Sequence, residues 1–185
     1  MNTGFESQLV EAYKSHLGDD LSSIVIFGSR ARGDHTENSD FDILIIADHL
    51  PERHLARMGF IREPLFKFDE IVQVLAKTPD EFDSIFPPLF LDIALDGKIL
   101  VDRDGFMEKR LRKIRMIIKD SSLYRIKLGD EFLWQWDSPK KPGWELATLP
   151  IEDHGWQNEY SRLDSNRRIF NLFEETLKRP LPQLR

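Results

Sequence analysis

The sequence predicts an α+β fold, with a mixed β-sheet of about four strands flanked by helices and a C-terminal extension containing a helix and a small hairpin. Short apolar runs bounded by turn residues, at 24–27 and 43–46, are typical of strands buried on both faces. Elsewhere apolar residues recur three and four positions apart, as they do along one face of a helix. The combination favours a central sheet covered by helices.

Composition limits the class of protein. A chain of 185 residues with 41% hydrophobic content suffices for one compact domain with an appendage, and 31% charged residues is ordinary for a globular protein. The net charge of −6 argues against general nucleic-acid binding. The absence of cysteine excludes disulfides, thiolate metal sites and cysteine nucleophiles. No apolar run reaches the roughly 18 residues of a membrane span, and residues 1–11 do not resemble a signal peptide, so a cytoplasmic location is expected.

The first helix is expected over residues 5–17 and the first strand over 24–27. Gly18 is available to end the helix, whose apolar stripe comprises Phe5, Leu9, Ala12, Tyr13 and Leu17. The strand runs directly into Gly28 and Ser29. A tight turn and a short helix are therefore expected before the second strand.

Gly28 and Ser29 could hold a phosphate group. Glycine has no Cβ, so another group can approach its backbone closely. If Ser29 begins a helix, the free amides there attract anions. The Ser29 hydroxyl and the forked guanidinium groups of Arg30 and Arg32 match phosphate oxygens. On its own, a Gly-Ser pair after a strand is more often an ordinary turn, and that alternative stays open.

Asp40 and Asp42 open the second strand and are two residues apart. Residues at this spacing point to the same face of a strand. Neighbouring carboxylates raise one another's pKa unless a cation lies between them, and hard carboxylate oxygens suit Mg²⁺. The alternative is an Asp-rich turn in which Ser39 and Asp40 cap the strand.

The run Gly28-Ser29-Arg30-Ala31-Arg32-Gly33, followed by Ser39-Asp40-Phe41-Asp42-Ile43, resembles the signature of the DNA polymerase β-like nucleotidyltransferase superfamily, in particular its small minimal members. The resemblance implies that a nucleoside triphosphate, with ATP the expected donor, gives up its nucleoside monophosphate to an acceptor hydroxyl. It implies that Asp40 and Asp42 bind Mg²⁺ and are catalytic. It also implies that Gly28 and Ser29 bind the nucleotide, and Arg30, Arg32 and Ser39 are expected to bind it with them.

The superfamily pattern includes a third carboxylate on the next strand, shortly before a helix that often begins Thr-Pro. Thr78 and Pro79 are present, but the position that they indicate is Gln73, which cannot serve as a general base. Asp69 has the same strand parity but would lie roughly 13 Å further along. Three hypotheses remain: an Mg²⁺-dependent nucleotidyltransferase, a catalytically degenerate nucleotide-binding or partner-binding module such as an antitoxin, and a structural α+β domain whose motif is fortuitous. A protein partner is left open.

Between the second strand and residue 101, turn residues mark the remaining elements of the sheet domain. A helix is expected from Leu50-Pro51-Glu52, and a third strand over 66–76 after Pro64. Thr78-Pro79-Asp80-Glu81 reads as a capping box for the next helix, which Pro87-Pro88 must interrupt before it resumes to Leu95. A short edge strand over 98–101 completes the expected sheet.

A boundary is expected at the turn 102–105, which gives a nucleotidyltransferase-like domain over 1–104 and an extension over 105–185. A helical stripe opens the extension at Met107, Leu111, Ile114 and Ile118. The basic residues between them form either a solvated face or a basic wall toward an anion. Trp134 and Trp136 should share one face of a strand, paired through a turn at 138–143 with a strand at 145–149, and a last helix is expected over 163–177. The tryptophan cluster is either a small hairpin core or a stacking platform for a base.

Overall fold

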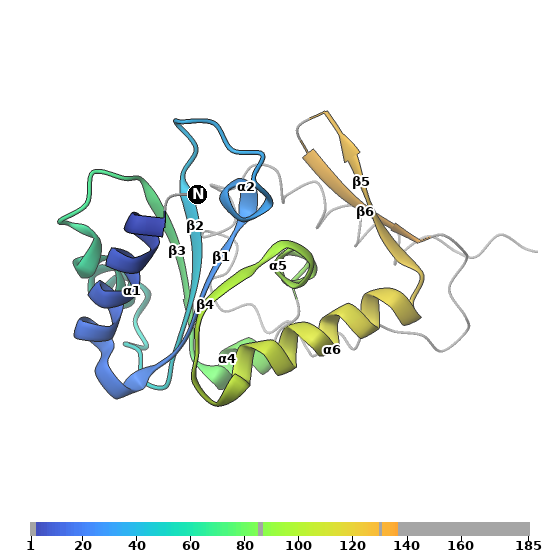
Figure 1. Ribbon diagram of the computed structural model, residues 1–185. Helices are drawn as coiled ribbons and strands as arrows, with labels where there is room; N and C mark the ends of the chain where they lie inside the picture. The colour runs from blue at the N-terminus through green and yellow to red at the C-terminus, as the bar shows by residue number, and fades with distance from the viewer. Residues whose placement is uncertain (1–2, 85–86, 130, 137–185) are drawn as a thin grey trace, which may run out of the picture.

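The computed structural model describes residues 3–84, 87–129 and 131–136 of the chain. They form a four-stranded mixed sheet, the helices around it and a separate two-stranded hairpin, which confirms the α+β class (Figure 1). The expected turn at 138–143, strand at 145–149, last helix and tryptophans 144 and 156 lie outside these residues. In the described part, no helix combines the length and apolar character needed to cross a membrane.

The sheet has the strand order β3-β2-β1-β4. Its strands are β1 (Leu21–Phe27), β2 (Phe41–Ala47), β3 (Val72–Lys77) and β4 (Lys98–Asp102). β1 runs antiparallel to both β2 and β4, and β2 runs parallel to β3. β1 and β2 occupy the centre and are buried almost throughout, as their continuous apolar sequences predict. The expected edge strand is β4.

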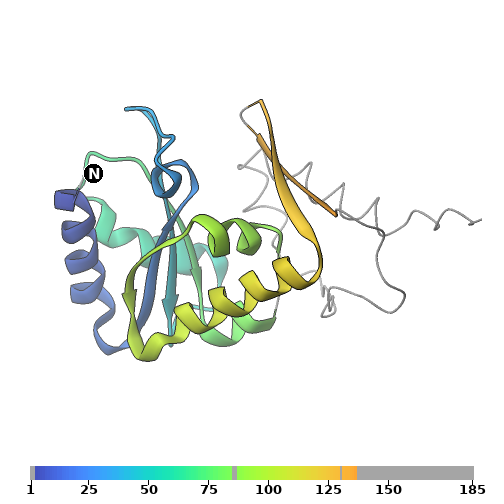
Figure 2. The same ribbon diagram turned by 45° about the vertical axis from the view of Figure 1, so that its right-hand side comes forward.

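Helices cover both faces of the sheet (Figure 2). On one face lie α1 (Thr3–Leu17) and α3 (His54–Arg62), and on the other lie α4 (Pro79–Ser84), α5 (Leu89–Asp96) and α6 (Phe106–Asp120). Alternate residues of β1 belong to different hydrophobic clusters, Ile24 and Ile26 packing with α1 while Val25 and Phe27 pack with α5 and α6. The five apolar residues expected to form the α1 stripe are all buried, and so are the four of α6.

Three short 3₁₀ turns connect these elements: η1 (Gly18–Asp20), η2 (Glu63–Leu65) and η3 (Arg103–Gly105). Around η2 the structure corrects the expected third strand, which begins at Val72 and not at Phe66. The amides of Phe66 and Phe68 donate to the carbonyls of Glu63 and Leu65, so local turns use the donors that a strand would need. The helix before η2, α3, likewise begins late, at His54, a few residues after the expected Leu50-Pro51 start.

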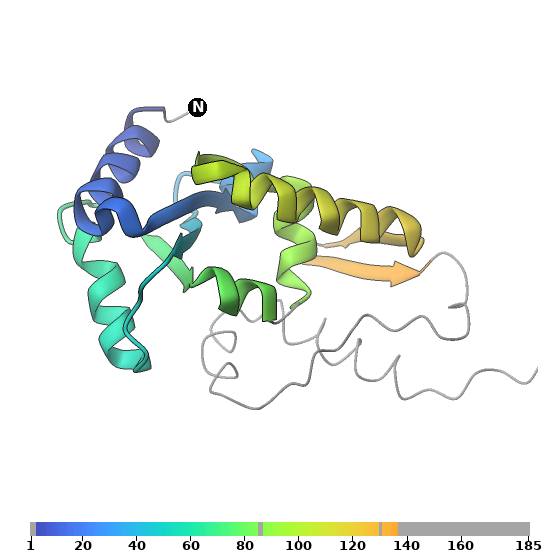
Figure 3. The ribbon, with the colours of Figure 1, turned by 90° about the horizontal axis from the view of Figure 1, so that it is seen from below.

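A hairpin follows α6 and stands beside α5 (Figure 3). It consists of β5 (Leu123–Leu128) and β6 (Glu131–Trp136), paired antiparallel with Arg125 opposite Trp134 and Lys127 opposite Phe132. The tryptophan strand pairs with the upstream segment 123–128, which was not expected to be a strand, while the expected pairing with 145–149 lies outside the described residues. The two basic residues of segment 123–128 continue the basic composition of α6 and hide the alternation.

Candidate active site

The turn after β1 brings the backbone of Gly28 against Asp42. Gly28 opens the five-residue helix α2 (Gly28–Arg32) with a φ of 70°, a value that disfavours residues with a side chain. A Cβ added there would lie 2.2 Å from the Asp42 Oδ2 atom. Two reasons therefore require glycine at this position: the positive φ, and the lack of room for a side chain beside Asp42. Ser29 follows directly, so the expected phosphate turn and the acidic pair meet at one end of the sheet.

Asp42 is a half-buried carboxylate that lies near one negative charge, that of Asp40, and one positive charge, that of Arg32. It pairs with Phe27 of β1 on one side and with Gln73 of β3 on the other. Burial raises the pKa of Asp42 to about 6, the negative charge of Asp40 adds to the increase, and the positive charge of Arg32 partly offsets it. The two acids therefore interact, as their spacing predicted.

Gln73 lies where the Thr-Pro signal places it. Its side chain is exposed, and its Nε2 donates to the Asp40 Oδ2 atom at 3.3 Å. Because Gln73 is level with Asp42 across the parallel pair β2–β3, this amide occupies the strand position nearest to both carboxylates. Asp69, in contrast, precedes β3 altogether. The amide can orient Asp40, but it has no basic site for a proton.

Arg30 and Ser39 stabilise the loop between α2 and β2. The Arg30 guanidinium donates to the Ser39 carbonyl at 2.6 and 3.1 Å and to the Glu37 carbonyl at 3.3 Å, and it lies 4.4 Å from the centre of the Phe41 ring. The Ser39 hydroxyl accepts from the Thr36 amide at 2.9 Å. These contacts fix the loop that delivers Asp40. Roles of Arg30 and Ser39 toward a nucleotide stay predictions.

Arg32 connects the site to the hairpin. Its Nε donates to Asp34 Oδ2 at 3.2 Å, and its guanidinium lies 4.8 Å from the centre of the Phe132 ring and 4.0 Å from Asp96 of α5. Nothing in the sequence near the motif indicates Asp96 or Phe132. Their place at the site depends on how α5 and the hairpin pack.

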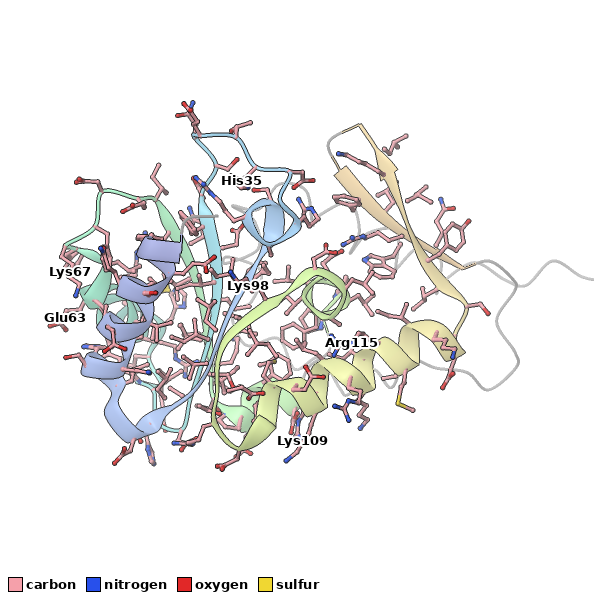
Figure 4. All side chains as sticks on the ribbon, viewed as in Figure 1. His35, Glu63, Lys67, Lys98, Lys109 and Arg115 are labelled. Carbon is pink, nitrogen blue, oxygen red and sulfur yellow. The ribbon has the colours of Figure 1, made fainter. Side chains whose placement is uncertain are left out.

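The basic residues of α6 lie away from this site. Figure 4 shows His35 on the loop above α2, Lys109 near the start of α6 at the bottom of the view, and Arg115 further along α6, beside α5. Arg110 is paired with Asp83, and Arg115 donates to the Ala94 carbonyl at 3.0 Å and to Glu108 at 3.2 Å. The structure therefore brings these residues to neighbouring acceptors and not to the phosphate turn.

The two acidic residues fit a magnesium ion shared with a nucleotide. Mg²⁺ commonly takes one or two protein carboxylates and completes its shell with water and substrate phosphates. Asp40 and Asp42 supply that number, and a cation between them would relieve the repulsion that raises the pKa of Asp42. Within the described ranges, His, Asp and Glu side chains nowhere gather in threes or more to form a metal site made by protein alone.

Residues 6–127 match the family model of the nucleotidyltransferase domain. This match spans more than half of the chain, and the protein belongs to that family, which confirms the resemblance seen in the motif. A curated relative from Methanocaldococcus jannaschii, "Putative protein adenylyltransferase MJ1305", is 37% identical over 117 residues, covering 60% of this chain and 80% of the relative. A second from the same organism, "Putative protein adenylyltransferase MJ0141", is 49% identical over 73 residues, covering 40% and 62%.

Among solved structures, a toxin–antitoxin crystal structure with AMP-PNP has a TM-score of 0.49 and 21% sequence identity, covering 65% of this chain and 89% of that chain.

Proposed function

We propose that this nucleotidyltransferase-family protein uses Mg²⁺ to transfer adenosine monophosphate from ATP to a hydroxyl group, with a protein side chain as the first acceptor class to test. The observation that supports this proposal is the close approach of the Gly28 backbone to Asp42, where an added Cβ would lie 2.2 Å from the Asp42 Oδ2 atom. The names of the curated relatives support the adenylyl donor and the protein acceptor. The cytoplasmic location expected from the sequence stays a prediction.

In the proposed reaction the acceptor oxygen forms a bond to the α-phosphorus while the bond to the bridging oxygen breaks, and pyrophosphate leaves. The Gly28 backbone lets the triphosphate approach closely, and the Ser29 hydroxyl donates to a phosphate oxygen. Asp40 and Asp42 would hold Mg²⁺, and a metal ion bound there would supply positive charge to neutralise the charge that develops on the phosphates. The hydroxyl proton leaves to one of these carboxylates or to water, because the Gln73 amide cannot accept it.

The direct test is a calorimetric titration with a panel of nucleoside triphosphates, with and without Mg²⁺, followed by transfer assays with ATP labelled on the α- or γ-phosphate. We expect Mg²⁺-dependent binding of ATP and transfer of the α-label alone. The double variant Asp40→Asn/Asp42→Asn should lose both while its circular dichroism spectrum stays that of the natural protein. Undiminished transfer by the variant would disprove the assignment of the two acids.

A second function is favoured by one observation, the presence of Gln73 beside Asp40. Without a third carboxylate, the domain could bind a nucleotide or a protein partner and turn over slowly or not at all. The variant Gln73→Asp separates the two functions. A large gain in transfer would identify the natural protein as a degenerate binding module. Efficient transfer by the natural protein, with no gain in the variant, would instead support the nucleotidyltransferase.

A further inference from the structure

A partly buried network of charged and aromatic side chains fastens the hairpin to α5. Arg125 of β5 donates to Asp92 Oδ1 at 3.0 Å and to Asp96 Oδ1 at 2.9 Å. The indole nitrogen of Trp134 donates to Asp92 Oδ1 at 3.2 Å. Only 14% of the Arg125 side chain and 14% of the Asp96 side chain are exposed, so solvent screens this ion pair weakly. The hairpin is thus held at a defined place on the sheet domain.

Arg32 joins the same network from the opposite side, as the last residue of α2. The Phe132 ring of β6 is contacted by two guanidinium groups, with Arg32 at 4.8 Å and Arg125 at 4.4 Å from the ring centre. Asp96, which binds Arg125, also lies 4.0 Å from an Arg32 nitrogen. Phe132 and Asp96 therefore restrict a long side chain that would otherwise sample many rotamers.

The place where Arg32 is held matters because Arg32 is the last residue of α2, the helix that Gly28 and Ser29 of the phosphate turn open. Of the two arginines in the motif, Arg30 uses its donors on the carbonyls of the loop. Among the described residues, Arg32 makes one hydrogen bond to a side chain, from Nε to the exposed end of Asp34. A guanidinium that is fixed before binding loses less conformational freedom when it meets a phosphate.

We propose that the hairpin β5–β6 is a working part of the nucleotide site, in which Phe132, Asp96 and Arg125 hold Arg32 so that it binds the phosphates of the donor. Arg32 is the binding residue, and the other three are positioning residues. The inference rests on the proposed function and deepens it, because it assigns a role to a segment that lies beyond residue 104 and outside the sequence motif.

A double-mutant cycle on the full chain tests this proposal. Arg32→Ala, Phe132→Ala and the double variant are compared by kcat and by KM for ATP. Each single change should raise KM about 10-fold, since a bond to phosphate present before and during transfer affects binding and not kcat. If Phe132 acts through Arg32, Phe132→Ala should cause no further loss in the Arg32→Ala background. Phe132→Leu, which keeps the apolar volume, should still raise KM and guards against loss of the hairpin fold.

Arg110→Gln is the matched control. Arg110 also pairs with an aspartate, Asp83, and lies 4.6 Å from the centre of an aromatic ring, that of Phe106, but on α6 away from the site. The Arg110→Gln variant should have the same KM for ATP as the natural protein. Unchanged KM in the Phe132 variants, or an equal loss from Phe132→Ala with and without Arg32, would overturn the inference while leaving the proposed function intact.

If the natural protein binds ATP without turnover, the same cycle is read from the dissociation constant measured by calorimetry. If it neither binds ATP nor transfers a nucleotide, the proposed function fails, and the role of the hairpin in it fails too.

Discussion

The environment of Asp42 disfavours the ionised form of its carboxyl group. Its pKa is raised to about 6, first by burial and then by Asp40. Because the folded state binds this proton more tightly than the unfolded state, the contribution of the group to stability is complete below the usual pKa near 3.8 and is lost as the pH rises through 6. Above that pH the ionised group lowers the free energy of unfolding.

Asp42→Asn should therefore abolish nucleotide transfer and yet stabilise the metal-free protein. Removing the charge should increase the free energy of unfolding by about 2 kcal/mol at pH 8, and this gain should disappear below pH 4, where the natural residue is protonated. Urea unfolding at the two pH values measures both. Mg²⁺ should stabilise the natural protein only. An equal difference between the two proteins at pH 4 and pH 8 would contradict this account of Asp42.

Gly28→Ala tests the close contact in the turn. Alanine meets both a positive φ and the Asp42 carboxylate, so the fold should lose about 2 to 4 kcal/mol and nucleotide binding should vanish. Gly33→Ala is the control, because Gly33 has a φ of 81° but, in the described part of the chain, no neighbouring atom within 4 Å of an added Cβ. That variant should lose only the conformational part, about 1 kcal/mol. Similar losses in the two variants would show that space beside Asp42 is not limiting.

Among the elements, α4 shows how far a local signal can determine structure. The expected capping box is present: Thr78 Oγ1 accepts from the Glu81 amide at 3.2 Å, and Glu81 Oε2 accepts from the Thr78 amide at 3.0 Å. Glu81 also accepts from both terminal nitrogens of Arg57 of α3, at 2.7 and 2.8 Å. Burial alone would raise the pKa of Glu81, but the bonds from Arg57 and Thr78 outweigh it and the pKa is lowered.

Because the pKa of Glu81 is lowered in the folded state, its stabilising effect is present above the usual pKa near 4.5 and is lost as the pH falls through the lowered value. Glu81→Gln should lower the free energy of unfolding by about 1 to 2 kcal/mol at pH 7. Most of that loss should disappear near pH 3. Asp80→Asn, an exposed change in the same turn, is the control and should have little effect. A Glu81 variant as stable as the natural protein at pH 7 would show that the cap is dispensable.

Elements with a strong local signal were predictable, and those determined by pairing were not. The stripes of α1 and α6, the interruption at Pro87-Pro88 and the central strands follow from periodicity and turn chemistry. The start of β3 and the existence of β5 depend on which strand each segment meets. The sequence alone does not show which strand each of these segments pairs with.

The same division applies to the site. Gly28, Asp40 and Asp42 were predicted to lie together from a short loop and strand alternation, whereas Gln73 was added to them by the resemblance to the superfamily pattern. The network around Arg32 was not predicted. Its members come from α2, α5 and the hairpin, and only tertiary packing joins them.

For the whole molecule, the hydrophobic core does not stop at residue 104. One cluster on the sheet contains Val25 and Leu44 of the central strands together with Leu111 of α6 and Trp134 of β6. The boundary after residue 104, between a nucleotidyltransferase-like domain and a C-terminal extension, stays a prediction. A shared core implies that the sheet and α6 unfold as one cooperative unit.

Leu111→Ala tests that cooperativity. Leu111 is 1% exposed, so its truncation should cost about 2 to 4 kcal/mol through lost burial and the cavity left behind. Met116→Ala, on the exposed side of α6 where the native residue is 58% exposed, should cost less than about 0.5 kcal/mol. With a common core, tryptophan fluorescence and far-ultraviolet circular dichroism should shift together in thermal melts of the Leu111 variant. Two separated transitions, with the sheet melting at the natural temperature, would show instead that α6 and the hairpin form an independent unit, and the hairpin could then not hold Arg32 in place.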